Sequence, residues 1–148
     1  MRCIPPALAF AATLCGFTPT QAAESKAFHL TPTLAHANVS HDPDGLWKPS
    51  DFSPFGNPPH LPSIYTATLK TPTGEWILSM LDNQCSPQSD CQAVLAFKSK
   101  DGGWKIVANP SLVMGGTATL SATFKTITTE EVDDSANGFT GKYDVGAP

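Results

Sequence analysis

The chain has 148 residues, a formal net charge of −4, and hydrophobic residues at 41% of its positions. That length supports a single hydrophobic core. The acidic balance argues against binding to nucleic acid, and no apolar run after the N-terminal region reaches the roughly 20 residues that a membrane-spanning helix needs.

Residues 1–22 have the pattern of a cleaved secretory signal peptide. Arg2 precedes an apolar stretch over residues 7–17, and small residues follow before the expected cleavage site. A lipoprotein is disfavoured, although Cys15 suggests one, because Leu14 is a poor residue to precede a lipidated cysteine. Cleavage leaves eight lysines against thirteen acidic residues, a net charge of about −5, which favours basic partners as well as solubility. We expect an exported, periplasmic protein.

Residues 23–62 are predicted to be irregular or partly helical. The segment is rich in Pro, His and Asp, and residues 42–45 and 56–59 have the composition of turns. His36 and His41, with the nearby aspartates, offer a candidate metal site, but solvation in a loop is the favoured interpretation.

Residues 63–148 are predicted to form an antiparallel β core. Two hairpins are expected, one joining residues 63–70 to 75–81 and one joining 92–98 to 104–108. We expect Gly102 and Gly103 to adopt positive φ in the second turn.

The C-terminal part of the core shows a second β pattern. Residues 117–132 alternate between apolar and polar positions and predict one long strand. An acidic turn over residues 130–134 and a short closing strand over residues 138–143 follow. The predicted fold is therefore mainly β, with α+β as the alternative: a five- to six-stranded antiparallel sheet in a single domain.

The sequence carries few signs of an enzyme. It has no nucleophile elbow, phosphate-binding loop or paired-cysteine zinc spacing. Trp76 and Trp104 begin predicted strands, so core packing is favoured over stacking on a carbohydrate. We expect no catalytic activity, no cofactor and no bound metal, and the oligomeric state stays open.

Two cysteines remain after cleavage, and we expect them to form a disulfide in an oxidising compartment. Cys85 and Cys91 enclose a polar segment that joins the two hairpins; its residues are Ser86, Pro87, Gln88, Ser89 and Asp90. A constrained, exposed loop of this kind is suited to binding a partner. The alternative is a loop that is closed only for stability.

The same cysteine segment resembles the Ivy family of periplasmic inhibitors of C-type lysozyme. The resemblance runs from residues 60–66 through 77–80, 85–91 and 93–94 to residues 137–139. The family loop has the form Cys-Lys-Pro-His-Asp-Cys and enters the lysozyme active-site cleft. Cys85, Pro87, Asp90 and Cys91 match in type and order. The loop of this chain is one residue longer, and Gln88-Ser89 replaces the histidine.

The resemblance implies a non-enzymatic inhibitor of a peptidoglycan-degrading enzyme, with residues 86–90 as the inserting loop. The missing histidine makes a cell-wall amidase an alternative target to a lysozyme-like glycosidase. The protein would then be an immunity factor against a secreted cell-wall toxin. A passive periplasmic ligand-binding β domain is the competing class.

Overall fold

The structure is a computed structural model that describes residues 26–83, 85 and 88–148. The predicted signal peptide therefore lies outside the described residues, as do Ser86 and Pro87 of the predicted binding loop. In the described part, no helix is both long and apolar enough to span a bilayer.

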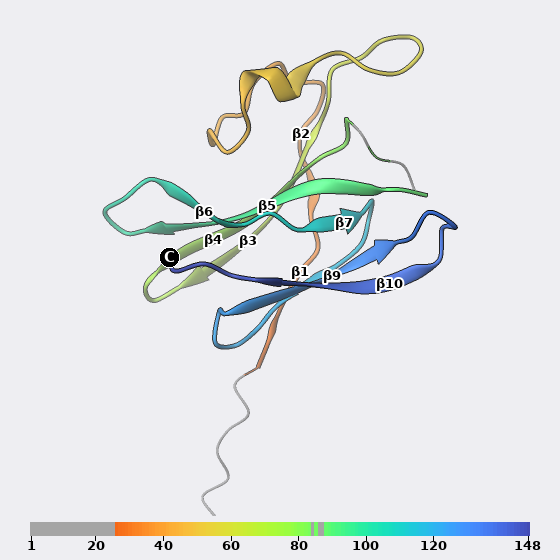
Figure 1. Ribbon diagram of the computed structural model, residues 1–148. Helices are drawn as coiled ribbons and strands as arrows, with labels where there is room; N and C mark the ends of the chain where they lie inside the picture. The colour runs from red at the N-terminus through yellow and green to blue at the C-terminus, as the bar shows by residue number, and fades with distance from the viewer. Residues whose placement is uncertain (1–25, 84, 86–87) are drawn as a thin grey trace, which may run out of the picture.

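Strands dominate the fold and form two antiparallel sheets that lie one above the other (Figure 1). The larger sheet has the order β2-β3-β4-β5-β6, and β7 pairs with the first residues of β5. Its strands are β2 (Thr33–His36), β3 (Ile64–Thr71), β4 (Gly74–Leu81), β5 (Asp90–Ser99), β6 (Trp104–Ala108) and β7 (Ser111–Val113). The smaller sheet has the order β1-β8-β9-β10, with strands β1 (Phe28–Leu30), β8 (Ala118–Leu120), β9 (Thr126–Val132) and β10 (Gly138–Asp144). The predicted mainly β, antiparallel fold is confirmed, but β1 and β2 lie within residues 23–62, which were expected to be irregular or partly helical.

The chain links the two sheets along both sides. On one side it leaves β1 of the smaller sheet and enters β2 of the larger sheet after only Thr31 and Pro32. On the other side, the amide of Val145 donates to the carbonyl of Lys125 at 2.9 Å, and the amide of Gly146 donates to the carbonyl of Val107 at 2.8 Å. The C-terminal segment thus hydrogen-bonds to both sheets.

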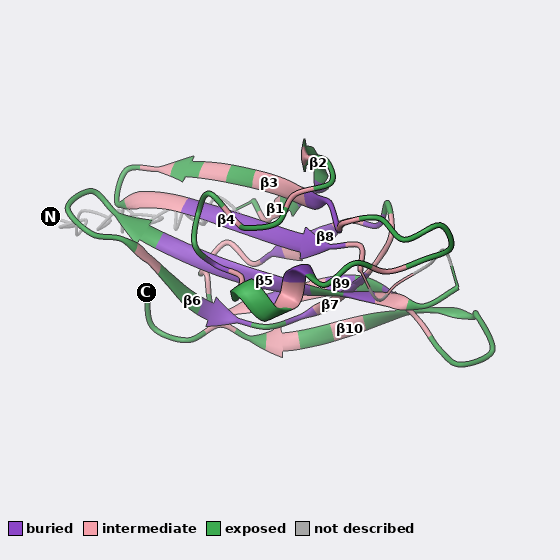
Figure 2. Cartoon of the chain, turned by 90° about the horizontal axis from the view of Figure 1, so that it is seen from above, coloured by how far each residue is buried: buried purple, intermediate pink, exposed green. Residues whose placement is uncertain are grey.

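The main core lies between the sheets. Alternate residues of β4 and β5 belong to the same buried cluster as residues of β1, β8 and β9. Figure 2 shows that much of β4 and β5 is buried. The apolar residues of this core that are 0% exposed are Leu78, Leu95, Leu112, Ala118, Leu120 and Ile127. This alternation is the packing expected where strands of two sheets meet face to face.

The opposite face of β4 and β5 is covered by residues 37–62. Leu46 packs on Ile77, and the indole Nε1–H of Trp47 donates to the buried hydroxyl of Ser79 at 2.9 Å. The covering segment contains one short 3-10 helix (Pro49–Phe52), whose Phe52 is buried. β4 is consequently buried on both faces, which accounts for its largely apolar sequence from Trp76 to Leu81.

Both predicted hairpins are confirmed, with one correction. The first closes through the pair Thr71 and Gly74, and a Cβ at Gly74 would overlap the carbonyl oxygen of Lys98. The expected positive φ of Gly102 and Gly103 is wrong, because neither glycine has one. The loop between β5 and β6 is long enough to turn without left-handed residues.

The single long strand expected over residues 117–132 is also wrong. A tight turn at residues 121–125 divides it into β8 and β9, which pair with each other. The hydroxyl oxygen of Ser121 accepts the backbone N–H groups of Lys125 and Thr126, both at 3.1 Å, and Phe124 adopts a φ of 56°. The side chain of Ser121 thus stabilises a turn that the alternating pattern concealed.

The expected acidic turn also begins later than predicted. Glu130 and Glu131 belong to β9, and the turn starts at Asp133, whose carboxylate accepts the amides of Ser135 and Asn137. The predicted closing strand is confirmed as β10.

Candidate functional site

The predicted binding loop joins β4 to β5 at one end of the two sheets, as the sequence indicated. Cys85 and Cys91 form a disulfide with a Cα–Cα distance of 4.7 Å. Gln88 and Ser89 are both exposed. We call residues 85–91 the cysteine loop, and the end of the sheets where it lies, with the turn after β9, the loop end.

The base of the cysteine loop is part of the hydrophobic core. Cys91 is only 1% exposed and pairs with Leu112 of β7, which is fully buried. Cys85 is half-buried and packs against the same core. The exposed residues of the loop therefore extend from a base that is fixed by packing, by strand pairing and by a covalent bond.

Asp90 connects this base to the other sheet. Its Oδ1 accepts the backbone N–H of Val132, at the end of β9, at 2.9 Å. Burial raises the pKa of Asp90, the hydrogen bond from Val132 lowers it, and the negative charge of Glu131 raises it, with a net upward shift. One oxygen of Asp90 is thus engaged within the protein.

A buried polar cluster that the sequence analysis missed lies beside Asp90. Glu131 is only 7% exposed, and its Oε1 accepts hydrogen bonds from the hydroxyls of Thr129 and Tyr143, both at 2.7 Å. The Tyr143 oxygen in turn accepts the amide of Ser111 at 3.2 Å. Burial and the bond to Glu131 raise the pKa of Tyr143. Glu131 lies two residues after Thr129 and four after Ile127, so all three side chains point to the same, buried face of β9. The sequence pattern did not reveal this, because a turn was expected over residues 130–134.

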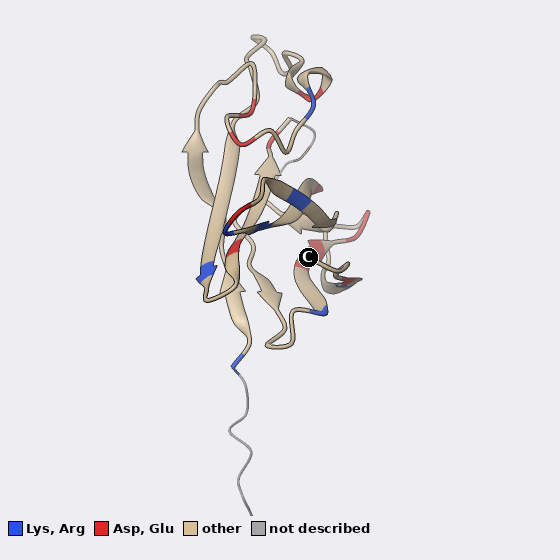
Figure 3. Ribbon diagram, turned by 90° about the vertical axis from the view of Figure 1, so that its left-hand side faces the viewer, with Lys and Arg blue, Asp and Glu red and all other residues tan. Residues whose placement is uncertain are grey.

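Charge is divided between the two ends of the strands. The opposite end, which we call the hairpin end, carries the turns after β3, β5 and β8; Figure 3 looks onto this end, with lysines blue and acidic residues red. Every lysine after residue 63 lies in the half of a strand, or in the turn, that is nearer the hairpin end: Lys70, Lys98, Lys100, Lys105, Lys125 and Lys142.

The loop end has the opposite charge. It carries Asp82, Asp90, Glu130, Glu131, Asp133 and Asp134, and none of the described residues after position 63 at this end is a lysine. The hairpin end also holds Glu75, Asp101 and Asp144, which partly offset its lysines. The cysteine loop therefore lies at the strongly acidic end of a bipolar molecule, an arrangement that attracts a basic partner to the loop.

The remaining candidate residues carry structural roles. The carboxylate of Asp42 accepts the amides of Asp44, Leu46 and Trp47 at 2.9, 2.7 and 3.1 Å, which confirms the predicted turn. Trp76 is buried in the core, as predicted, and Trp104 is half-buried on the outer face. Across residues 26–83, 85 and 88–148, no three His, Cys, Asp or Glu side chains are grouped to hold a metal ion.

Comparison of the chain with known protein families, with curated proteins and with solved structures finds no match.

Proposed function

We propose that this protein is exported and inhibits a peptidoglycan-degrading enzyme, without catalytic activity of its own, by placing the cysteine loop in the active-site cleft of that enzyme. The observation that carries the proposal is the position of the loop: exposed Gln88 and Ser89 extend from a rigid, disulfide-closed base at the acidic end of the molecule. A loop whose base is fixed by a disulfide and by strand pairing loses less conformational freedom on binding than an unconstrained one. The disulfide is consistent with an oxidising compartment such as the periplasm.

The chemistry of the two exposed side chains suits a glycosidase cleft. Such a cleft presents two carboxyl groups, of which one is held protonated as the general acid. A blocking loop must therefore offer donors and acceptors together. The amide of Gln88 and the hydroxyl of Ser89 each offer both.

A cell-wall amidase is the second candidate target for the same loop. The observation that favours it is Gln88-Ser89 in place of the histidine of the lysozyme inhibitors. The Ser89 hydroxyl is suited to hydrogen-bond the imidazole of a cysteine–histidine amidase. In that case the protein serves as an immunity factor against a cell-wall toxin.

The test is a lytic assay of the purified protein against a hen-type lysozyme and a panel of peptidoglycan amidases. We expect one enzyme to be inhibited, and we expect the double variant Gln88→Ala/Ser89→Ala to lose most of that inhibition. The matched control is Lys100→Ala/Asp101→Ala, two exposed residues at the hairpin end whose combined removal leaves the net charge unchanged.

Three results are informative against the proposal. Equal inhibition by the protein and its loop variant would remove the loop from the mechanism. Equal losses in the loop variant and the control would indicate an effect that is not specific to the loop. An absence of inhibition across the whole panel would favour the passive ligand-binding domain.

A further inference from the structure

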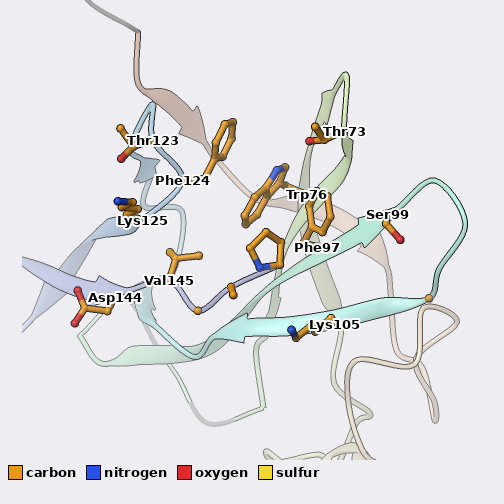
Figure 4. A pocket seen from close by; sticks show the side chains of 14 residues that line it. Thr73, Trp76, Phe97, Ser99, Lys105, Thr123, Phe124, Lys125, Asp144 and Val145 are labelled. Carbon is orange, nitrogen blue, oxygen red and sulfur yellow. The ribbon is translucent and has the colours of Figure 1, made fainter.

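A cavity of about 990 Å³ opens at the hairpin end, and Figure 4 shows the side chains that line it. The cysteine loop lies at the other end of β4 and β5. The cavity lies between the two sheets, where the turns after β3, β5 and β8 meet the C-terminal segment, so both sheets supply its walls. The volume is at the upper end of the range of roughly 300–1,000 Å³ that is typical of small-molecule sites.

Aromatic rings form the apolar wall of this cavity. Trp76 and Phe124 stack with their ring centroids 5.0 Å apart and their planes 11° apart, and Phe97 lies against Trp76 at 4.9 Å. Trp76 and Phe97 come from the larger sheet and are nearly fully buried, whereas Phe124, from the turn after β8, is half-buried. Phe124 is therefore the most exposed of the three rings that line the cavity.

The position of Phe124 depends on an unusual backbone conformation. A bulky residue rarely adopts a positive φ, and the φ of 56° at Phe124 is held by the hydrogen bonds to Ser121. This conformation places the ring on Trp76 and on Phe28, whose ring centroid is 5.3 Å away. Such conformations tend to persist where the surrounding structure requires them, and they cluster at binding sites.

The polar part of the cavity wall combines the hydroxyl groups of Thr73, Ser99 and Thr123 with three charged side chains. Lys105 contributes a cation from β6 and Lys125 contributes one from the turn before β9, one from each sheet, whereas Asp144 contributes an anion. A smaller hollow beside the cavity shares Ser99 with it, and its charged lining residues are three more lysines and one carboxylate: Lys70, Lys98, Lys100 and Glu75. The hairpin end thus combines an aromatic cavity with a positive potential, although the whole protein is acidic.

We propose that this cavity binds a small amphipathic anion, with its apolar body against Phe124 and Trp76 and its carboxylate directed to Lys105 and Lys125. Burial of the apolar body would supply most of the affinity. The two lysines would select a carboxylate over a neutral head group of the same size. This site is independent of the proposed inhibition, because the cysteine loop lies at the other end of β4 and β5.

The test compares octanoate with octan-1-ol, which share a chain length and differ in charge. Each is titrated into the full-length exported protein labelled with ¹⁵N, and NMR follows the amides of Phe124 and Val145 with the indole signal of Trp76. The other two indole signals are assigned with Trp47→Phe and Trp104→Phe. We expect saturable binding of octanoate at one site, about tenfold tighter than that of octan-1-ol.

Two variants separate specific recognition from general charge. Lys105→Gln/Lys125→Gln should weaken octanoate binding about tenfold and leave octan-1-ol unchanged. Lys48→Gln/Lys142→Gln makes the same change in net charge at exposed lysines that line neither the cavity nor the smaller hollow, and it should leave both affinities unchanged. Equal affinities for acid and alcohol, equal losses in both lysine variants, or no saturable shift at the cavity would each overturn the proposal.

Discussion

The Asp90 carboxylate and the Val132 amide join the two sheets at the loop end through a hydrogen bond of 2.9 Å between Oδ1 and N. Asp90 directly precedes Cys91, so this bond fixes the base of the cysteine loop relative to β9 as well as relative to its own sheet. The same carboxylate is partly buried and lies near the negative charge of Glu131. Burial and the charge of Glu131 therefore disfavour ionisation of the Asp90 carboxyl group that accepts this hydrogen bond.

The raised pKa of Asp90 predicts a pH dependence of stability. Because the folded state favours the protonated form, Asp90 contributes most to the free energy of unfolding below its unfolded pKa of 3.8, and this contribution is lost as the pH rises through the folded pKa. Relative to Asp90→Asn, the unmodified protein should gain stability between about pH 7 and about pH 4. Urea unfolding of both proteins across that range measures the difference. A difference that does not change with pH, or that changes in the opposite direction, contradicts this prediction.

Asp133 should show the opposite dependence. Hydrogen bonds from Asn137 and Ser135 lower the pKa of Asp133, so its contribution to stability is present above 3.8 and is lost as the pH falls through the folded pKa. Asp133→Asn should therefore destabilise the protein at neutral pH, and the deficit should shrink in acid. The same urea series provides the measurement, and a deficit that grows in acid would disagree with the hydrogen bonding at this turn.

Gly141 should tolerate no side chain. A Cβ at Gly141 would overlap the carboxylate of Glu131, which is held in place by Tyr143 and Thr129. Gly141→Ala should lower the free energy of unfolding by about 1–3 kcal/mol, the usual cost of overpacking. Gly138→Ala is the matched control in the same strand, since its nearest neighbour would lie 3.9 Å from the new Cβ. Similar losses in the two variants would mean that crowding by Glu131 is not the cause.

The hydrogen bond between Trp47 and Ser79 should couple the covering segment to the larger sheet. Ser79 is 1% exposed, and the indole of Trp47 donates to its hydroxyl. Each single change, Trp47→Phe and Ser79→Ala, leaves one polar partner unpaired, at a cost of about 1–3 kcal/mol. The double variant removes both partners, so its loss should be smaller than the sum of the single losses. Chemical unfolding of the four proteins gives this coupling, and strict additivity would show that the bond contributes nothing.

The sequence predicted the strand that is buried continuously, and it failed where a local turn interrupts an alternating pattern. The largely apolar run from Trp76 to Leu81 correctly indicated a strand, because a strand that is buried on both faces carries few polar residues. The alternation from Ala118 onward gave the wrong strand, since the hydrogen bonds of Ser121 and the left-handed φ of Phe124 are local features that a two-residue period does not express.

The two candidate sites differ in the same way. The cysteine loop was predicted because its limits are set by two residues close in sequence, Cys85 and Cys91. The aromatic cavity brings together Trp76, Phe97 and Phe124 from separate strands and turns, and no spacing along the chain relates them. The separation of lysines from acidic residues is partly predictable. The sequence gives their positions along the chain, and the antiparallel strand pairing then decides at which end of the sheets each one lies.

The acidic loop end predicts how fast a basic target enzyme associates. Asp134 is an exposed residue of the turn beside the cysteine loop, and Asp101 is an exposed residue of the hairpin-end turn, so Asp134→Lys and Asp101→Lys make the same change in net charge at opposite ends. If the loop end meets the target, Asp134→Lys should slow association several-fold at low ionic strength, and salt should reduce this effect. Asp101→Lys should leave the association rate nearly unchanged, because its charge lies away from the contact. Stopped-flow or surface-based binding to the inhibited hydrolase measures both rates, and equal effects of the two variants would show that net charge, rather than the acidic loop end, guides the encounter.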